Sequence, residues 1–310
     1  FMFTAQKTLF LYAVSPVHMG AGQAIGLIDN PIQREVHTGH PVFAGSGIKG
    51  AVRHRFYALL SKEDKRLERY FGADSQAASD YAGAVSFSDA QLVLFPVRCT
   101  KAGYVYATSP LALARAKRLL ALSGLKTWDD VAEPETNKCV VTQEHLLVEK
   151  TNDKSQKNKM LYVEAYELNA KPDEKLKAIA TILANYALAD DQDFFKNKII
   201  SDLVLMNNDD FGYFVKNATS IEPHVRIVPE TGVAKDGGLF YTENLPPESV
   251  MIQNVMATAE RSKAGTDKAE DVLSFVLEGD LGLHGKLLQV GGDATTGRGQ
   301  VLVNVAGGAK

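Results

Sequence analysis

The chain has 310 residues, of which 45% are hydrophobic and 23% charged, a composition typical of globular proteins and not of disordered or fibrous ones. No apolar run approaches the 18 residues of a membrane-spanning helix, and the first residues lack the features of a signal peptide. The formal net charge of −3 argues against coating of nucleic acid by bulk charge, so any nucleic-acid site must be local.

The first predicted strand is the apolar run at 9–14, which leads into a polar, glycine-bearing segment at 15–40. This segment is about twice as long as connections usually become without a function or disorder. A helix is predicted after the glycine cluster at 45–47, because apolar residues then recur at nearly 3.6-residue spacing. Ser46 is the expected N-cap of this helix.

The middle of the chain alternates between predicted strands and helices. Strand patterns occur at 84–90 and 92–95, and the dipeptides Ser109-Pro110 and Pro172-Asp173 are expected to open helices. The polar segment 150–159 is expected to be a mobile connection. Asp209 and Asp210 invite a metal-binding interpretation, but we expect them to cap a helix.

The last third predicts a long β-hairpin, because strand patterns at 224–228 and 238–243 flank a glycine-containing tip at 231–237. A helix is predicted at about 269–277. It is followed by a strand, a glycine-rich loop at 291–299 and a final strand. Interleaved strands and helices of this kind indicate an α+β fold.

The start of the first helix has the chemistry of an anion site. A helix N-terminus, nearby glycines and Lys49 in the first turn together favour phosphate. Arg53 lies four residues further on the same face, although a basic cluster such as 53–55 is also typical of a solvated helix. The pattern G-x-G-x-x-G at 45–50 does not indicate a dinucleotide fold, because the charged residues that follow are unlike a buried parallel strand.

Asp29 is the acidic residue that stands out in the long N-terminal segment. Pro31 biases Asn30 toward an extended conformation, so Asp29 is expected to project from a defined bend. From the spacing alone, an Asp-Asn-Pro turn in which the carboxylate bonds nearby backbone is the more common arrangement. A catalytic or metal-binding carboxylate is the alternative.

Five blocks of sequence carry a family resemblance. They are SPVHMG at 15–20, GLIDNPIQRE at 26–35, HTGHPV at 37–42, GSGIKGAVR at 45–53 and GGDATTGRG at 291–299. In this order and spacing they resemble the RAMP superfamily, specifically the backbone subunit of the type III-B (Cmr) CRISPR effector complex.

The resemblance implies one α+β domain over residues 1–310 with a modified ferredoxin-like (RRM-like) RAMP core. The expected parts are a core mainly at 5–60, 84–96 and 270–306, a helical and loop insertion at about 100–215, and a β-hairpin thumb at about 220–247.

The resemblance also implies binding to guide RNA and to complementary target RNA, stacking of copies into a helical filament, and contact with other Cmr-complex subunits. The RNA-binding residues it implies are Lys49, Arg53, Ser46, Gly47, Arg298 and Gly297. Apolar thumb residues are expected to open the duplex at regular intervals, and the candidates are Val228, Val233 and Phe240. No membrane partner is expected. The two cysteines, Cys99 and Cys139, are interpreted as free thiols of a cytoplasmic protein.

By the same resemblance, the subunit is a metal-dependent endoribonuclease within the assembled complex. Asp29 is the expected catalytic residue and the possible ligand of Mg²⁺ or another divalent cation, since Mg²⁺ often uses one or two carboxylates plus phosphates. His18 and Glu243 are further catalytic candidates. A histidine that only bonds the loop backbone is the alternative for His18.

Two other functions are weighed against this one. A non-catalytic RNA-binding scaffold would hold the guide while another subunit cuts, and Asp29 would then be a turn residue. An enzyme that matures guide RNA is disfavoured, because no metal-free cluster of histidine, tyrosine and lysine stands out in the sequence.

Overall fold

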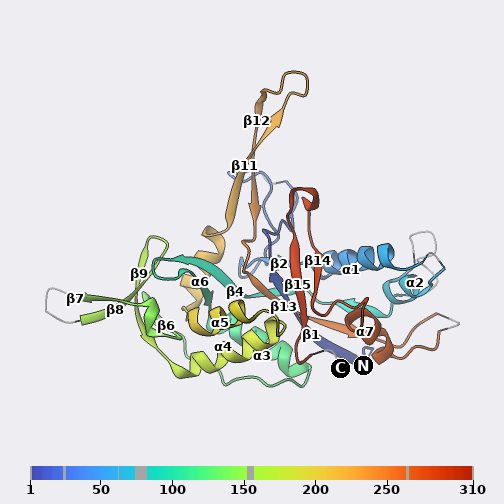
Figure 1. The fold of residues 1–310 in the computed structure, drawn as a ribbon, viewed down its shortest axis with the longest axis horizontal. Helices are drawn as coiled ribbons and strands as arrows, with labels where there is room; N and C mark the ends of the chain where they lie inside the picture. The colour runs from blue at the N-terminus through green and yellow to red at the C-terminus, as the bar shows by residue number, and fades with distance from the viewer. Residues whose placement is uncertain are drawn as a thin grey trace.

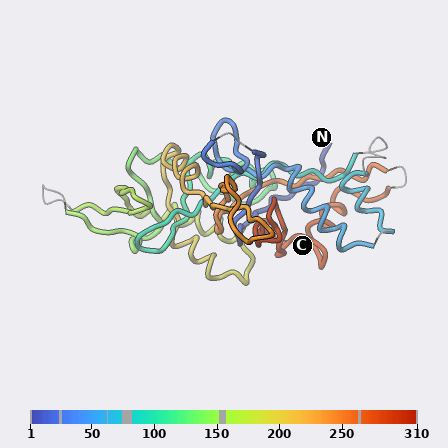
Figure 2. The backbone as a smooth tube through the Cα atoms, turned by 90° about the horizontal axis from the view of Figure 1, so that it is seen from above, coloured from blue at the N-terminus to red at the C-terminus, as the bar shows by residue number. Residues whose placement is uncertain are grey.

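The computed structural model describes residues 2–23, 26–61, 63–73, 82–151, 157–262 and 265–308. Within these residues a mixed sheet extends through the molecule and helices pack on it, while one β-hairpin projects far from the body (Figure 1). Viewed from above, the molecule is elongated (Figure 2). The N-terminal loop, the projecting hairpin and the C-terminal glycine-rich loop lie side by side near its middle in both views.

In the described part of the chain the sheet has 13 strands, and its main path follows the order β14-β15-β1-β13-β4-β5-β10-β6-β9-β8-β7. Two short strands lie off this path, with β2 paired to β4 and β3 paired to β13. The strands are β1 (Ala5–Ala13), β2 (Val42–Phe43), β3 (Val85–Phe87), β4 (Ala90–Cys99), β5 (Gly103–Thr108), β6 (Lys138–Val141), β7 (Val148–Thr151), β8 (Lys157–Val163), β9 (Tyr166–Pro172), β10 (Leu203–Leu205), β13 (Val250–Ala257), β14 (Lys286–Gln289) and β15 (Gln300–Val305).

The sheet is buried on both faces around β1. Leu9 and Leu11 belong to one hydrophobic core, while Phe10 and Tyr12 point to a second core on the opposite face. A strand enclosed in this way needs apolar residues at successive positions, which explains the continuous apolar run of β1. Its neighbours β13 and β15 both pair with it in antiparallel register.

The helices divide between the two faces. Helices α1, α2, α6 and α7 contribute to the core that contains Leu9, whereas α4, α5 and most buried residues of α3 contribute to the core that contains Phe10. The helical elements are α1 (Gly45–Leu59), α2 (Arg66–Phe71), α3 (Pro110–Leu122), η1 (Glu144–Leu146), α4 (Glu174–Ala187), α5 (Asp193–Asp202), α6 (Asn208–Asn217), α7 (Ala269–Leu277) and the short η2 (Ala294–Thr296).

Helix capping agrees with the sequence at two places and differs at two others. Helices α3 and α4 start where they were predicted to, and Ser109 and Asp173 are their N-caps, each accepting a hydrogen bond from a backbone N–H of the first turn. The prediction that Ser46 caps α1 is wrong, because α1 already begins at Gly45. The prediction for the aspartate pair is also wrong: Asn207 caps α6, and the two aspartates lie in its first turn, where their charge complements the helix dipole.

The segment expected to be a helical and loop insertion also contains strands. Strands β5 to β10 lie within it and continue the central sheet outward from β4. The mobile connection expected at 150–159 is bounded by strands, since β7 and β8 pair in antiparallel register on either side of it. Its centre, 152–156, lies outside the described residues.

The projecting hairpin consists of β11 (Ser220–Ile227) and β12 (Ala234–Asn244). The two strands pair in antiparallel register, with an irregularity between Val225 and Ile227. Cross-strand pairing gives the hairpin two different faces. Val225 opposite Leu239 forms an exposed apolar face, while His224 stacks on Phe240 on the other face, with ring centroids 5.2 Å apart.

Candidate functional site

The long N-terminal segment is held against the base of the hairpin by backbone pairing. Asn30 forms a parallel bridge with Thr242, and Val17 forms an antiparallel bridge with Leu245. The N–H of Asn30 donates to the carbonyl of Tyr241 at 3.1 Å, and the N–H of Glu243 donates to the carbonyl of Asn30 at 3.0 Å. The segment is therefore positioned by β12, which explains how so long a connection is ordered at this place.

Asp29 lies where this segment meets β12. Its Oδ2 accepts a hydrogen bond from the backbone N–H of Tyr241 at 2.7 Å, and the residue is half-buried. The bond reaches a residue far along the chain and not a neighbour within the Asp-Asn-Pro bend. This contact therefore differs from the local backbone bond expected of a simple Asp-Asn-Pro turn. It fixes the carboxylate of Asp29 where the loop meets the hairpin.

Glu243 lies two residues further along β12 and is 3% exposed. Its carboxylate forms an ion pair with Arg34 and accepts hydrogen bonds from the hydroxyl of Thr219 at 2.8 Å and the N–H of Ile32 at 3.0 Å. All of these partners are protein groups of the loop and the hairpin base. The geometry thus supports Glu243 as a residue that holds the loop in place, and it argues against the direct catalytic contact expected from the sequence.

His18 is tied to the same strand. Its Nδ1 lies 2.7 Å from the carbonyl oxygen of Glu243. A carbonyl can only accept, so Nδ1 carries the proton and the Nε2 of the neutral ring is left as an acceptor. This arrangement suits both a proton-accepting side chain and a histidine that only bonds the backbone. The structure brings Asp29 and His18 to neighbouring positions of β12, and both contacts involve its backbone.

The glycine-rich loop closes the other side of the site. The N–H of Gly292 donates to the carbonyl of His18 at 2.9 Å, and the N–H of Gly299 donates to the carbonyl of Pro16 at 2.8 Å. A Cβ at Gly291 would lie 2.3 Å from the carbonyl oxygen of His18, and its φ of +77° also favours glycine. Gly291 is therefore required for the close approach of the two backbones.

The resemblance implies both Arg298 and Gly297 in RNA binding, and both lie in this loop. They differ in whether other protein groups already contact them. The guanidinium of Arg298 is paired with Glu222 of β11 at 2.6 Å, so this cation also joins the loop to the hairpin. Gly297 has a left-handed φ of +83°, and a Cβ built there meets nothing within 4 Å. Its backbone is thus open to an approaching partner.

The N-terminus of α1 is less available than the sequence suggested. The N–H of Gly45 donates to the carboxylate of Asp89 at 2.7 Å, so an acidic side chain from the β3–β4 connection already occupies this end of the helix. Ser46 and Gly47 are exposed in the first turn. The expectation of free N–H groups at the start of this helix is therefore wrong for Gly45.

Lys49 is half-buried one turn into α1. Burial lowers the pKa of its ammonium group, and the positive charges of Arg261 and Arg53 lower it further. Arg261, in the connection between β13 and α7, was not identified from the sequence, because nothing in the chain order brings it near α1. On the other side of α1, a groove of about 660 Å³ runs between its glycine-bearing face and β14, and it is lined in part by Gly47, Gly50 and Gly291.

The three predicted thumb residues differ in their surroundings. Val233 is 62% exposed at the tip, whereas the N–H of Val228 donates to the carbonyl of Val233 and closes the turn. Phe240 is stacked on His224, and the guanidinium of Arg226 lies 5.9 Å from the centre of its ring. His224 and Arg226 were not identified from the sequence, although their alternation with apolar residues was a readable signal.

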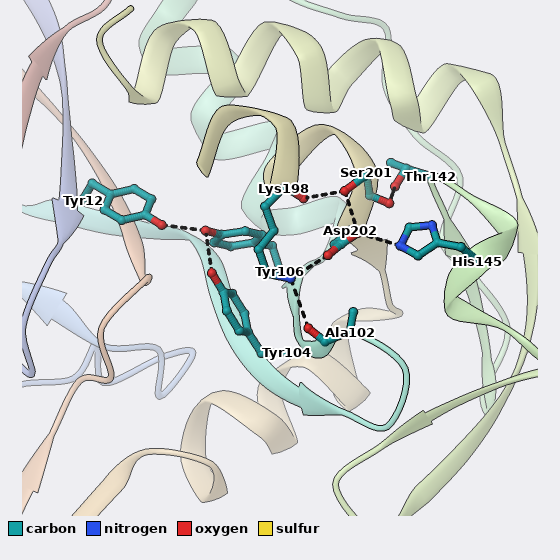
Figure 3. Close-up of polar contacts among 9 residues, drawn as sticks. All are labelled: Tyr12, Ala102, Tyr104, Tyr106, Thr142, His145, Lys198, Ser201 and Asp202. Carbon is teal, nitrogen blue, oxygen red and sulfur yellow. Dashed lines mark hydrogen bonds and ion pairs between the residues drawn. The ribbon is translucent and has the colours of Figure 1, made fainter. Parts of the chain in front are cut away.

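A second group of chemically active side chains lies away from this site. Asp202 accepts hydrogen bonds from Ser201 and Lys198 and is paired with His145 at 2.9 Å (Figure 3). Because the serine hydroxyl bonds the aspartate and not the histidine, the set lacks the order of a nucleophilic triad. Beside it, the hydroxyls of Tyr12, Tyr104 and Tyr106 form a buried chain between β1 and β5 (Figure 3).

The part of the chain that the structure describes contains no group of three or more histidine, cysteine, aspartate or glutamate side chains arranged to hold a metal ion. Across the same residues, no helix combines the length and the apolar character needed to cross a membrane.

Comparison with known proteins gives a family and a fold. The sequence profile of the RAMP superfamily matches residues 10–302. The CRISPR system Cmr endoribonuclease Cmr4 of Pyrococcus furiosus is 32% identical over 298 residues, which cover 95% of this chain and 94% of that protein.

Two solved structures have a similar fold. The crystal structure of oligomeric Cmr4 from Pyrococcus furiosus matches with a TM-score of 0.69 at 24% identity over 97% of each chain. A chain of the cryo-EM structure of type III-B Cmr-beta bound to cognate target RNA matches with a TM-score of 0.71 at 18% identity over 98% of each chain.

Proposed function

This chain belongs to the RAMP superfamily, and we propose that it is a guide-RNA-binding backbone subunit of a type III-B (Cmr) CRISPR effector complex that cleaves complementary target RNA at regular intervals. The relative at 32% identity is named as a Cmr endoribonuclease, and the alignment spans nearly the whole of both chains. The observation that carries the proposal is the position of Asp29, fixed by the N–H of Tyr241 between the loop and the projecting hairpin.

The proposed core is ferredoxin-like. The elements β1, α1, β4, β13, α7 and β15 follow one another in the βαββαβ order of that fold. Their strands are neighbours in the sheet order β15-β1-β13-β4, and both helices contribute to the same core. Strands β5 to β10 extend the sheet beyond β4, while β14 pairs with β15 at the opposite edge. The hairpin of β11 and β12 is the proposed thumb.

Guide RNA is proposed to lie across α1 and the glycine-rich loop. Lys49, Arg53 and Arg298 supply positive charge there, while Ser46, Gly47 and Gly297 allow the backbone of RNA to approach closely. Contacts with phosphates give affinity without sequence information, so specificity comes from base pairing between guide and target. The groove between α1 and β14 and the open backbone of Gly297 support this path.

The thumb is proposed to open the guide–target duplex at one step for each subunit. Val233 is the most exposed of the three proposed wedge residues, and it lies at the tip. Apolar side chains of this kind occupy space between unstacked bases. Phe240, stacked with His224 further down the hairpin, offers an aromatic surface to a displaced base.

Cleavage is proposed to occur at the displaced target nucleotide beside Asp29. The 2′-OH attacks the adjacent phosphorus while the 5′-oxygen of the next nucleotide leaves, and distortion by the thumb favours the in-line geometry. Asp29 orients the attacking hydroxyl or accepts its proton, and the Nε2 of His18 is the second group suited to moving a proton. Glu243 and Arg34 hold the loop that carries Asp29.

A divalent cation is part of the proposal. Asp29 brings a single carboxylate, which is compatible with Mg²⁺ because this ion often uses one carboxylate together with phosphates and water. When bound, Mg²⁺ would supply charge stabilisation at the scissile phosphate.

The partners proposed for this chain are guide RNA, complementary target RNA, further copies of itself in a helical filament, and other Cmr-complex subunits. Its proposed location is the cytoplasm, in keeping with Cys99 and Cys139, which are buried free thiols.

The test uses complexes assembled with guide RNA and given an end-labelled complementary RNA, with Mg²⁺ or with a chelator. Regularly spaced products that require guide complementarity support the proposal. Tight target binding without any products in the presence of Mg²⁺ would instead favour the non-catalytic scaffold.

A further inference from the structure

A separate hollow of about 380 Å³ lies at the start of α1, on the side toward β3. Its walls come from segments that are far apart in the sequence: the N-terminal stretch, the first turn of α1, β3, and the connection between β13 and α7. The lining residues that matter here are Phe3, Ser46, Lys49, Val85, Phe87 and Arg261. None of the blocks of the family resemblance contains Arg261 or the two phenylalanines.

The polar wall of the hollow is positively charged. Lys49 and Arg261 both line it, and Arg53 follows Lys49 by one turn of α1. Among the described residues, the charges that act most on Lys49 are the two arginines, both positive. Like charges held together in a half-buried place repel each other, and a bound anion would relieve this repulsion.

The lining of the hollow also includes apolar side chains. Phe3, Val85 and Phe87 contribute carbon surface within reach of the same space. Aromatic faces bind nucleobases by stacking, and the binding tolerates any base because every base has a π-face. A volume of about 380 Å³ is at the small end of ligand sites, which suits one nucleotide and not a large cofactor.

One N–H group at the N-terminus of α1 is already engaged, because Asp89 accepts from Gly45. In this proposal the phosphate contacts come from side chains. Lys49 and Arg261 approach the hollow from two elements, and the exposed hydroxyl of Ser46 lies beside them. A cation pair with a neighbouring hydroxyl is a common way to bind a phosphate.

We propose that this hollow is a nucleotide site, in which Lys49 and Arg261 hold one phosphate and the phenylalanine-lined wall receives the attached nucleoside. The ligand chemistry is a nucleoside monophosphate unit, from either a strand of bound RNA or a free nucleotide. This inference rests on the proposed function for its RNA source. It assigns to Arg261 a role in nucleic-acid binding, and it places the contact of Lys49 in this hollow, since Lys49 does not line the groove on the far side of α1.

The experiment compares Arg261→Gln, Arg261→Lys and the control Arg98→Gln. Arg98 is an exposed arginine on β4 whose partner is Glu164, so the control removes the same charge away from the hollow. The full-length variants are assembled with the other subunits and titrated with labelled guide RNA at several salt concentrations. We expect Arg261→Gln to weaken guide binding about tenfold and to reduce the salt slope by about one, with Arg261→Lys in between.

A second arm titrates the chain alone with adenosine monophosphate. Binding that is lost in Arg261→Gln and retained in Arg98→Gln identifies a free nucleotide as a ligand, whereas an effect on guide RNA alone identifies the strand as the source. Wild-type behaviour of Arg261→Gln in both arms overturns the inference. Failure of the wild type itself to bind guide RNA would count against the proposed function, and the nucleotide arm would still test the hollow.

Discussion

The carboxylate of Asp29 accepts a hydrogen bond from the backbone N–H of Tyr241 at 2.7 Å. The two residues belong to the N-terminal loop and to the hairpin, which lie side by side in both views (Figures 1 and 2). A movement of the hairpin base would therefore reach the carboxylate through this contact and through the backbone bonds of the adjacent Asn30. In the proposed mechanism this contact keeps Asp29 beside the nucleotide that the hairpin displaces.

Glu243 is predicted to contribute mainly to the stability of the fold and not directly to the cleavage reaction. Glu243→Gln removes the charge that pairs with Arg34 and leaves a guanidinium without its carboxylate in a largely buried place. We expect the free energy of unfolding to fall by about 3 kcal/mol, as for other buried pairs that lose one partner. Denaturant titration of the isolated chain measures this change.

Glu230→Gln is the matched control, because Glu230 is exposed near the tip of the same hairpin. It should leave the unfolding free energy within about 0.5 kcal/mol of the wild type. Equal stability of the two variants would contradict the supporting role assigned to Glu243.

Glu222 is predicted to restrain the RNA affinity of Arg298. The two side chains form an ion pair at 2.6 Å, so part of the charge of Arg298 is neutralised before RNA arrives. Glu222→Gln should tighten guide binding and increase the salt slope by up to about one, while Arg298→Ala should do the reverse. Filter binding at several salt concentrations gives both quantities. Glu230→Gln removes an equal charge nearby and is the control. If the two glutamate variants have the same guide affinity and the same salt slope, Arg298 does not contact the guide.

His40 is predicted to make the fold sensitive to acid. It is 4% exposed, and burial lowers the pKa of its imidazole from 6.5 to about 4. Between these two values the unfolded chain binds the proton more readily than the folded one, so the unfolding free energy should decrease as the pH falls. The limiting slope from this group is about 1.4 kcal/mol per pH unit, and above about pH 6.5 it contributes none.

Urea titrations of the chain between pH 7.5 and pH 5 test this prediction. His40→Gln should remove this part of the slope, whereas His54→Gln, at an exposed position on α1, should retain it. A wild-type slope in His40→Gln would mean that other groups cause the acid sensitivity.

The hydrogen-bonded tyrosines in Figure 3 link side chains of β1 and β5, and these bonds are predicted to stabilise the fold. The hydroxyls of Tyr12 and Tyr106 are 2.6 Å apart, and Tyr12 also bonds Glu248. Tyr12→Phe should lower the unfolding free energy by about 1–2 kcal/mol, because it leaves buried polar partners without their bond. Thermal unfolding measures this change. Tyr57→Phe, at a residue that is 64% exposed, is the control in this assay and should leave the unfolding free energy unchanged.

Much of the fold follows from local patterns in the sequence. Helix α7 was predicted with its observed bounds, and β1, α1, α3, α4 and the hairpin lie where periodicity and turn residues placed them. Strand β13 was not predicted, although it lies at the centre of the sheet. The buried residues Gln253 and Asn254 interrupt its apolar run, and Asn254 is satisfied by Thr8, a partner 246 positions away.

The site is less accessible to sequence reasoning, because its decisive contacts are long-range. Asp29 was singled out as a candidate by its residue type and local sequence, but its bond to Tyr241 spans 212 positions. The pairing of Glu243 with Arg34 and the capping of α1 by Asp89 are likewise distant in sequence. Residue type and local spacing identify which side chains carry chemistry, whereas only the packed fold decides which of them are already engaged by other protein groups.

In the proposed mechanism the hydrogen bond to Tyr241 positions Asp29, and the charge of its carboxylate is needed for cutting. Asp29→Asn is the informative change, because the amide oxygen still accepts from the N–H of Tyr241 and the loop keeps its anchor. The measurement is the rate of target-RNA cleavage by complexes assembled with guide RNA and Mg²⁺, with target affinity measured in parallel. The account predicts a loss of at least about 100-fold in rate at unchanged affinity. Regularly spaced products at the wild-type rate would contradict it and leave the chain as an RNA-binding scaffold.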